Sequence, residues 1–240
     1  MRVKAVISYD GSFYQGFQRQ KITSQTVTGQ IEEVLYSLGI ISPIVGSGRT
    51  DTGVHASGQV IHFDLPDFWK DLKKLNNEIN RKLTHIRFKH LTAVPDSFHA
   101  RFSAKKRLYR YVFKTSCPSV FENNYVSYYL PFDQQILIEA LRCFEGEHDF
   151  QYFQKTGTDT HTTIRHVYHT EYKQFRSYHI IYFEANGFLR SQVRMMIDAA
   201  MACATGKLSL PSLKEQVACK KRHITTLAPP HGLYLARILY

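Results

Sequence analysis

A carboxylate and a guanidinium lie two residues apart in a glycine-containing stretch, residues 46–56, which carries Arg49 and Asp51. Short apolar runs at 40–45 and 60–63 flank this stretch, so we expect it to be a loop that joins two strands. A guanidinium close to a carboxylate favours the ionised form of the acid. Because an ionised carboxylate is the nucleophilic form, the pattern is suited to covalent catalysis by Asp51.

Asp51 has two other possible interpretations. An aspartate before a glycine in a loop most often forms a turn. The triplet Asp51-Thr52-Gly53 is also the signature of aspartic proteases, but those enzymes need a second carboxylate that shares a proton with the first. A neighbouring arginine opposes such sharing, so the sequence favours a carboxylate nucleophile over a protease.

Metal ligands and nucleotide-binding motifs are not expected. His166 and His169 are three residues apart, so on a strand their side chains point to opposite faces, and no carboxylate or thiolate completes a set with them or with His161. No phosphate-binding glycine loop or dinucleotide motif occurs. The cysteines show no metal or redox spacing; they are Cys117, Cys143, Cys203 and Cys219. We therefore expect chemistry that uses no metal and no cofactor.

The charge balance points to a polyanionic partner. The chain has 240 residues and a net charge of +11, with 15 Tyr and 16 Phe, and such a basic excess is typical of nucleic-acid-binding proteins. Basic residues stand beside aromatic ones, a pattern suited to phosphate contacts and base stacking; examples are Arg101, Arg107, Arg110, Phe102 and Tyr109. The alternative for the segment 109–111 is a half-buried strand with tyrosines inside and Arg110 outside.

The elements that must position these residues can be read from hydrophobic periodicity. Strands are expected at 3–9, 40–45, 59–64, 86–94, 108–114, 166–175, 178–185 and 232–239. Helices are expected over 27–38 with Thr26 as N-cap, over 68–79 and 136–144, over 188–205 before Gly206, and over 211–219. Both halves therefore follow the order strand, helix, strand, strand, helix, strand.

This order predicts an α+β fold made of two ferredoxin-like (split β-α-β) halves, residues 1–97 and 98–240. We expect a mixed, mainly antiparallel sheet with helices on one face and a central cleft that holds the active site. The start of the chain has no apolar segment of a signal peptide, and no apolar run approaches the length of a membrane span. With few, dispersed cysteines, we expect a reduced protein of the cytoplasm.

Several motifs, in the same order along the chain, resemble the TruA-type tRNA pseudouridine synthases. The most specific is the Arg-Thr-Asp-x-Gly-Val-His block around Asp51. The others are Tyr9-Asp10-Gly11-Ser12, Gly16-Phe17-Gln18, Gly58-Gln59-Val60, Phe98-His99-Ala100-Arg101-Phe102-Ser103-Ala104, Tyr109-Arg110-Tyr111, Asn186-Gly187-Phe188, Val193-Arg194 and Gly232-Leu233-Tyr234-Leu235.

The resemblance implies a cofactor-free enzyme that isomerises uridine to pseudouridine in the anticodon stem-loop of tRNA and works as a homodimer. Asp51 matches the catalytic aspartate, and Arg49 matches the arginine that pairs with it and fills the space of the flipped base. Tyr109 matches the tyrosine that stacks on the target base. Arg194 matches a further arginine near the carboxylate. Arg101, Arg107 and Arg110 are expected to bind the substrate.

The chemistry leaves some choices open. Asp51 would attack either C1′ of the sugar or C6 of the base, and Tyr109 is a candidate for the base that takes the C5 proton. Phe17, Arg190-Ser191-Gln192 and Lys155–Thr163 depart from the family pattern. The alternatives are a tRNA-binding or RNA-chaperone protein that has lost catalysis, and a hydrolase that uses Asp51, which would need a second acid or base.

Overall fold

The structure, a computed structural model, describes residues 1–155, 157 and 160–240. It divides into two compact units: Met1–Lys105 together with Tyr234–Tyr240, and Lys106–Leu233. Three residues of the unusual segment 155–163, residues 156, 158 and 159, lie outside the described part of the chain. The predicted division into two ferredoxin-like halves, residues 1–97 and 98–240, stays a prediction.

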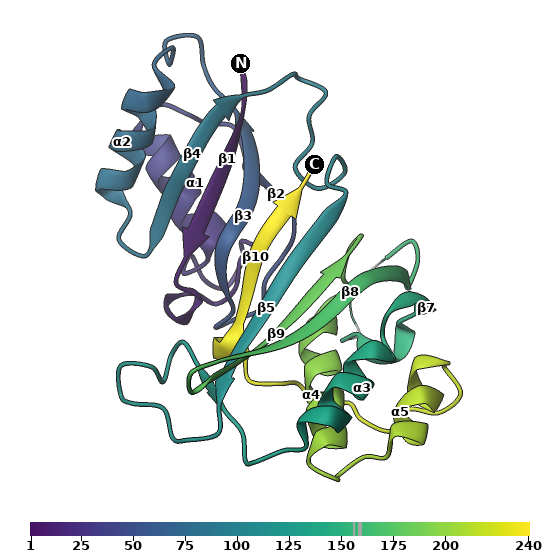
Figure 1. Cartoon of the computed structure of the whole chain (residues 1–240). Coiled ribbons are helices and arrows are strands. Elements are labelled where there is room, and N and C mark those ends of the chain that lie inside the picture. Colours follow the sequence, from purple (N-terminus) through teal and green to yellow (C-terminus); the bar gives the residue numbers. More distant parts are fainter. Residues whose placement is uncertain (156, 158–159) are drawn as a thin grey trace. The chain divides into compact units, whose positions relative to one another are not determined.

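The first unit is a sheet with two helices on one face (Figure 1). The strands follow the order β4-β1-β3-β10. β1 is antiparallel to β3 and β4, whereas β10 is parallel to β3, and β2 pairs with β3. The elements are β1 (Arg2–Tyr9), α1 (Val27–Ser37), β2 (Val45–Gly46), β3 (His55–Asp64), α2 (Leu72–Lys82), β4 (Ile86–Ala93) and β10 (Leu233–Leu239).

Local sequence explains several of these elements. Alternate residues of β1 are buried, so one face of the strand meets the core. Thr26 caps α1 as predicted, because its side chain accepts a hydrogen bond from the backbone N–H of Gly29 at 3.1 Å. Asp71 caps α2 in the same way through Lys74.

The second unit also carries its helices on one face of a sheet (Figure 1). Its strands follow the order β5-β9-β8-β7, and β6 pairs in parallel with β5. The elements are β5 (Lys106–Lys114), β6 (Ser127–Tyr128), α3 (Gln134–Arg142), β7 (Gly146–Asp149), β8 (Ile164–Phe175), β9 (Tyr178–Ala185), α4 (Gln192–Ala204) and α5 (Leu210–Val217). Helix α4 packs against α3 and α5, so it is buried on more sides than the predicted stripe of Val193, Met196, Ile197, Ala200 and Cys203.

The α+β class and the mainly antiparallel pairing are confirmed, but three expected elements were wrong in detail. Residues 40–44 form no strand: Ile41 is 83% exposed, and Pro43 has no N–H to donate to a ladder. The helix expected from Phe68 begins at Leu72, after the Asp71 cap. The helix expected from Phe188 begins at Gln192, after Ser191 in a left-handed conformation.

The final strand lies where it was expected, and its residues Tyr234 and Leu235 pair in parallel with His55 and Ala56 of β3, in the first unit. The β7 strand and the two-residue β6 strand were not predicted. The second unit therefore contains two strands beyond those that were expected.

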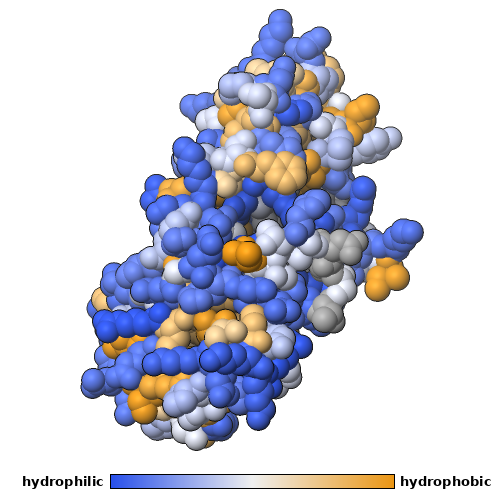
Figure 2. Space-filling model, turned by 90° about the vertical axis from the view of Figure 1, so that its right-hand side faces the viewer, coloured by the Kyte–Doolittle hydropathy of each residue, from blue (hydrophilic) through white to orange (hydrophobic). Residues whose placement is uncertain are grey.

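On the face drawn in Figure 2, hydrophobic side chains occur in small groups among hydrophilic ones. Within the described residues, no helix combines the length and the hydropathy needed to cross a membrane.

Candidate active site

The loop that carries Arg49 and Asp51 joins β2 to β3 in the first unit. Thr50, between these two residues, is buried, and its hydroxyl shares a hydrogen bond of 2.7 Å with the hydroxyl of buried Tyr9. The carbonyl of Thr50 also accepts the backbone N–H of Phe17 at 3.0 Å. The backbone immediately after Arg49 is thus held by β1 and by the segment that follows it.

The backbone before Arg49 is held by Gln59, a residue of β3 with no exposed surface. Its side-chain amide donates to the carbonyl of Gly48 at 2.8 Å, and its carbonyl oxygen accepts the N–H of Val60 at 3.1 Å. The N–H of Ser47 donates to the carbonyl of Val60 at 2.8 Å. Buried hydrogen bonds on both sides of Arg49 therefore fix this part of the loop.

Glycines allow the segment after β1 to approach the loop closely. A Cβ on Gly11 would lie under 3.0 Å from the carbonyl of Val54. Gly16 has a φ of +103°, and a Cβ there would lie 3.2 Å from the carbonyl of Thr50. Both positions exclude a larger side chain, so backbone packs directly on backbone.

The end of the loop is a turn in which the N–H of Val54 donates to the carbonyl of Asp51 at 3.1 Å. Gly53 has a φ of +76°, as the third residue of a type II turn requires. His55 then begins β3, with its Nδ1 3.0 Å from the Gly11 nitrogen and 3.3 Å from the Asp10 carboxylate. The turn that begins at Asp51 is therefore anchored on both sides.

Arg49 is exposed and Asp51 is half-buried. A carboxylate on a loop that is held by buried bonds has its position set before a substrate arrives, which is the arrangement that favours a catalytic group. The pairing of Arg49 with Asp51, and the role of each, stay predictions.

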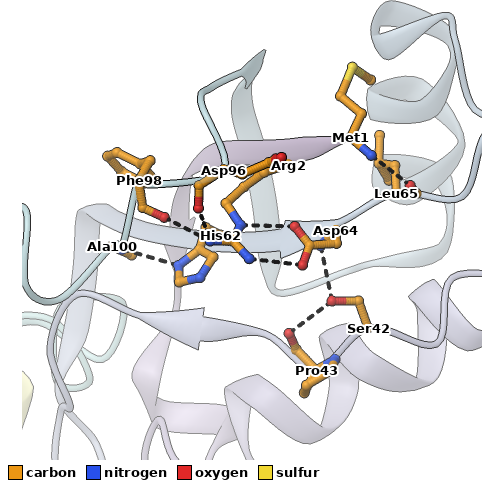
Figure 3. Close-up of polar contacts among 10 residues, drawn as sticks. All are labelled: Met1, Arg2, Ser42, Pro43, His62, Asp64, Leu65, Asp96, Phe98 and Ala100. Carbon is orange, nitrogen blue, oxygen red and sulfur yellow. Dashed lines mark hydrogen bonds and ion pairs between the residues drawn. The ribbon is translucent and has the colours of Figure 1, made fainter.

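Arg101 lies in another loop of the first unit, between β4 and the end of that unit. Buried His62 holds this loop, because its Nδ1 accepts the N–H of Ala100 at 3.1 Å. Burial is the main cause that lowers the pKa of His62. Arg2 pairs with Asp64 and donates to the carbonyls of Asp96 and Phe98 (Figure 3).

The loop presents a cation together with an aromatic ring. The guanidinium carbon of Arg101 lies 5.7 Å from the centre of the Phe102 ring, and Phe102, which is 77% exposed, stacks on His99 at 4.3 Å. An exposed ring beside an arginine suits contact with an unpaired base and a phosphate.

The other predicted residues belong to the second unit. Tyr109 on β5 is buried, and its ring is perpendicular to that of Phe188 at 5.2 Å. Arg107 lies on the same face of the strand and donates to the carbonyl of Asn186 at 2.6 Å. Arg110 lies on the opposite face of the strand and is half-buried, so its predicted contact with substrate stays a prediction.

Arg194 lies in the first turn of α4 and is half-buried. Its Nε donates to the carbonyl of Ala228 at 2.8 Å. This bond sets the orientation of the guanidinium plane, which makes Arg194 a fixed cation and not a mobile surface charge.

The first unit thus carries Arg49, Asp51 and Arg101, and the second carries Tyr109, Arg107, Arg110 and Arg194. The supporting roles of Tyr9, Gly11 and Gln59 were missed, because sequence separations of up to 43 residues hide these contacts. The only signal was that they belong to the motifs quoted above. Within the described residues, no group of three or more His, Cys, Asp or Glu side chains is placed to hold a metal ion.

Comparison with known proteins shows to which family this chain is similar. A family model described as tRNA pseudouridine synthase matches residues 5–103 and 140–240. A tRNA pseudouridine synthase A of Helicobacter hepaticus is 41% identical over 99% of this chain and 98% of its own length. One from Campylobacter jejuni is 38% identical over the full length of both chains, and one from a Geobacillus species is 37% identical over 100% and 98%.

The chain therefore belongs to the tRNA pseudouridine synthase family, and the resemblance seen in its motifs is confirmed. Its curated relatives are enzymes of the A type. Among solved structures, a Cbf5–Nop10–Gar1 complex aligns with 83% of this chain and 45% of that chain at 10% identity and a TM-score of 0.37. That similarity is too low to support an argument.

Proposed function

We propose that this protein is a tRNA pseudouridine synthase that isomerises uridine in the anticodon stem-loop, with Asp51 as the nucleophile. The observation that carries the proposal is the anchoring of the Asp51 loop by buried Tyr9 and Gln59, in a chain of this family. The net charge of +11 supports a polyanionic substrate. The alternative, an RNA-binding protein without catalysis, gains no support from the relatives.

The target uridine first leaves its stack, which costs a few kcal/mol. Arg49, exposed at the surface of the loop, fills the vacated space, and Tyr109 stacks on the base. The carboxylate of Asp51 then attacks C1′ of the sugar or C6 of the uracil, and the bond between C1′ and N1 breaks.

The uracil turns and C1′ joins C5, and the bond to Asp51 breaks. The proton on C5 leaves last, with Tyr109 as the candidate base. The base keeps all its atoms apart from the exchange of this proton: N1 gains one from solvent as C5 loses one. A homodimer and a cytoplasmic location complete the proposal; the four cysteines are free, which is in keeping with a reducing compartment.

Release of the C5 proton is the signal to measure. Bulk tRNA carrying tritium at C5 of uridine is incubated with wild type, Asp51→Ala and Asp67→Ala, and tritium in water is counted. Wild type and Asp67→Ala, which removes an exposed aspartate outside the site, should release tritium. Asp51→Ala should release none while still binding tRNA. No release from wild type would exclude the function, and equal release from Asp51→Ala would exclude the nucleophile.

Arg49→Lys tests the second residue of the loop. The substitution replaces the planar guanidinium group of arginine by the compact ammonium group of lysine, which acts as a point charge. We therefore expect a large loss of turnover with a modest loss of tRNA affinity. Unchanged turnover would remove Arg49 from the mechanism and would leave the Asp51 result standing.

A further inference from the structure

A run of basic residues follows α5 in the second unit and is not part of the site described above. Lys220, Lys221 and Arg222 are exposed. The next residue, His223, is half-buried and lies 2.8 Å from the carboxylate of Glu215. We call residues 220–222 the basic triplet.

The backbone before the basic triplet is fixed by the way in which α5 ends. The N–H of Cys219 donates to the carbonyl of Gln216 at 3.1 Å, and the N–H of Lys220 donates to the carbonyl of Glu215 at 2.9 Å. This pair of bonds is a Schellman motif. Cys219 takes the left-handed position with a φ of +54°, which is unfavourable for a residue other than glycine, and its Sγ contacts the carbonyl of Asp149 at 3.0 Å.

The backbone after the basic triplet is held by the side chain of Gln216, which has no exposed surface. Its amide nitrogen donates to the carbonyls of Tyr152 at 3.2 Å and Ile224 at 2.9 Å. Its oxygen accepts the N–H groups of His223 and Ile224, both at 2.9 Å. All four hydrogen-bonding positions of the glutamine are used, so three cations follow one another on a short loop that is tied at both ends.

The charges of the triplet form no ion pair in the described part of the chain. Lys220, Lys221 and Arg222 make no ion pair there, whereas Arg2, Lys106 and Lys114 each pair with a carboxylate. Three exposed cations that make no ion pair with the described residues, on a loop whose backbone is held at both ends, offer a positive surface of defined position. Phosphate groups of nucleic acid are the partner that such a surface fits.

We propose that the basic triplet binds the sugar-phosphate backbone of the tRNA substrate. This inference rests on the proposed function, since it takes tRNA as the substrate. Phosphate contacts hold an RNA in register without reading its sequence, so the triplet would contribute affinity and not the choice of uridine.

The test is the salt dependence of tRNA binding. The dissociation constant of unmodified tRNA is measured over a series of KCl concentrations for wild type and for the variant Lys220→Ser, Lys221→Ser, Arg222→Ser. We expect the dissociation constant of the variant to rise about tenfold or more near 0.1 M salt. The slope of log K against log salt should shrink by roughly 2 to 3.

Two matched variants serve as controls. Lys70→Ser, Lys73→Ser, Lys74→Ser removes the same charge from exposed positions in the first unit, and its slope and affinity should stay close to those of wild type. Lys220→Arg, Lys221→Arg, Arg222→Lys keeps the charge and should also bind as wild type does. Far-ultraviolet circular dichroism and the urea midpoint show whether each variant is folded.

The inference is overturned if removal of the triplet leaves the slope unchanged, as a merely solvated loop would. It is also overturned if the first-unit variant loses as much affinity, because net charge would then explain the effect. Failure of the proposed function looks different: wild type would release no tritium or would not bind tRNA at all.

Discussion

Arg194 and Ala228 are joined by two hydrogen bonds that run in opposite directions. The Nε of Arg194 donates to the carbonyl of Ala228 at 2.8 Å, and the N–H of Ala228 donates to the carbonyl of Arg194 at 3.1 Å. One turn further along α4, the carboxylate of Asp198 accepts the hydroxyl of Thr226. The segment 226–228 thus lies along α4 and holds the guanidinium in one orientation.

Thr226→Val should loosen this segment and with it the orientation of Arg194. Under the proposed function we expect turnover to fall by roughly 3- to 10-fold with little change in tRNA affinity, because one hydrogen bond is worth about 1 kcal/mol. Single-turnover tritium release and a binding titration measure the two quantities. Thr225→Val, the same change at an exposed neighbour, should keep full turnover, and an equal loss there would argue against positioning.

Gln59→Leu should weaken both the fold of the first unit and the proposed chemistry. The carbonyl of Gly48 and the N–H of Val60 lose their side-chain partner, and a buried polar group without a partner costs about 1–3 kcal/mol. We expect a lower urea midpoint and slower tritium release. Gln135→Leu alters an exposed glutamine on α3 and should leave both unchanged. A stable, fully active Gln59→Leu protein would contradict the supporting role.

Gly11→Ala should destabilise the protein by about 1–3 kcal/mol, the usual range for overpacking. Its new methyl group would meet the backbone of Val54, which cannot move aside as a flexible side chain can. Gly187→Ala places a methyl group at an ordinary contact distance of 3.6 Å from Arg165, so its stability should be close to that of wild type. Equal urea midpoints for the two variants would rule out the close approach at Gly11.

Stability at acidic pH should depend on Glu122. The hydrogen bond from Tyr178, followed by bonds from Ser119, lowers the pKa of Glu122 from 4.5 to about 2. A carboxyl group with a lower pKa in the folded state stabilises the fold above its unfolded pKa. That contribution is therefore present above about pH 4.5 and is lost as the pH falls towards 2.

Urea midpoints measured between pH 6 and pH 2 test this dependence. Glu122→Gln should show a smaller decline through the window from about 4.5 to 2 than wild type does. Glu139→Gln, the same change at an exposed position of α3, should follow the wild-type curve. If Glu122→Gln declines as steeply as wild type, the carboxylate is not the group responsible.

Periodicity and capping in the sequence determined most local elements of this protein. Tyr109, Tyr111 and Phe113 share the buried face of β5, as their alternation predicted. Thr26 caps α1, and Gly206 takes the left-handed conformation after α4. These features depend on side chains a few residues apart, whose geometry the local backbone sets. The motif around Asp51 also pointed to the family that the relatives confirm.

Only the tertiary structure decided how distant segments meet. Nothing in the local pattern of residues 234–239 indicates that they pair with β3 of the first unit, or that residues 40–44 stay outside the sheet. The bonds from Tyr9 to Thr50 and from Gln59 to Gly48, and the fit of Gly11 against Val54, join separate segments of chain. A tyrosine or a glutamine shows its partner only when packing brings the segments together, because hydrogen bonding and close contact act over a few ångströms in space, whatever the separation in sequence.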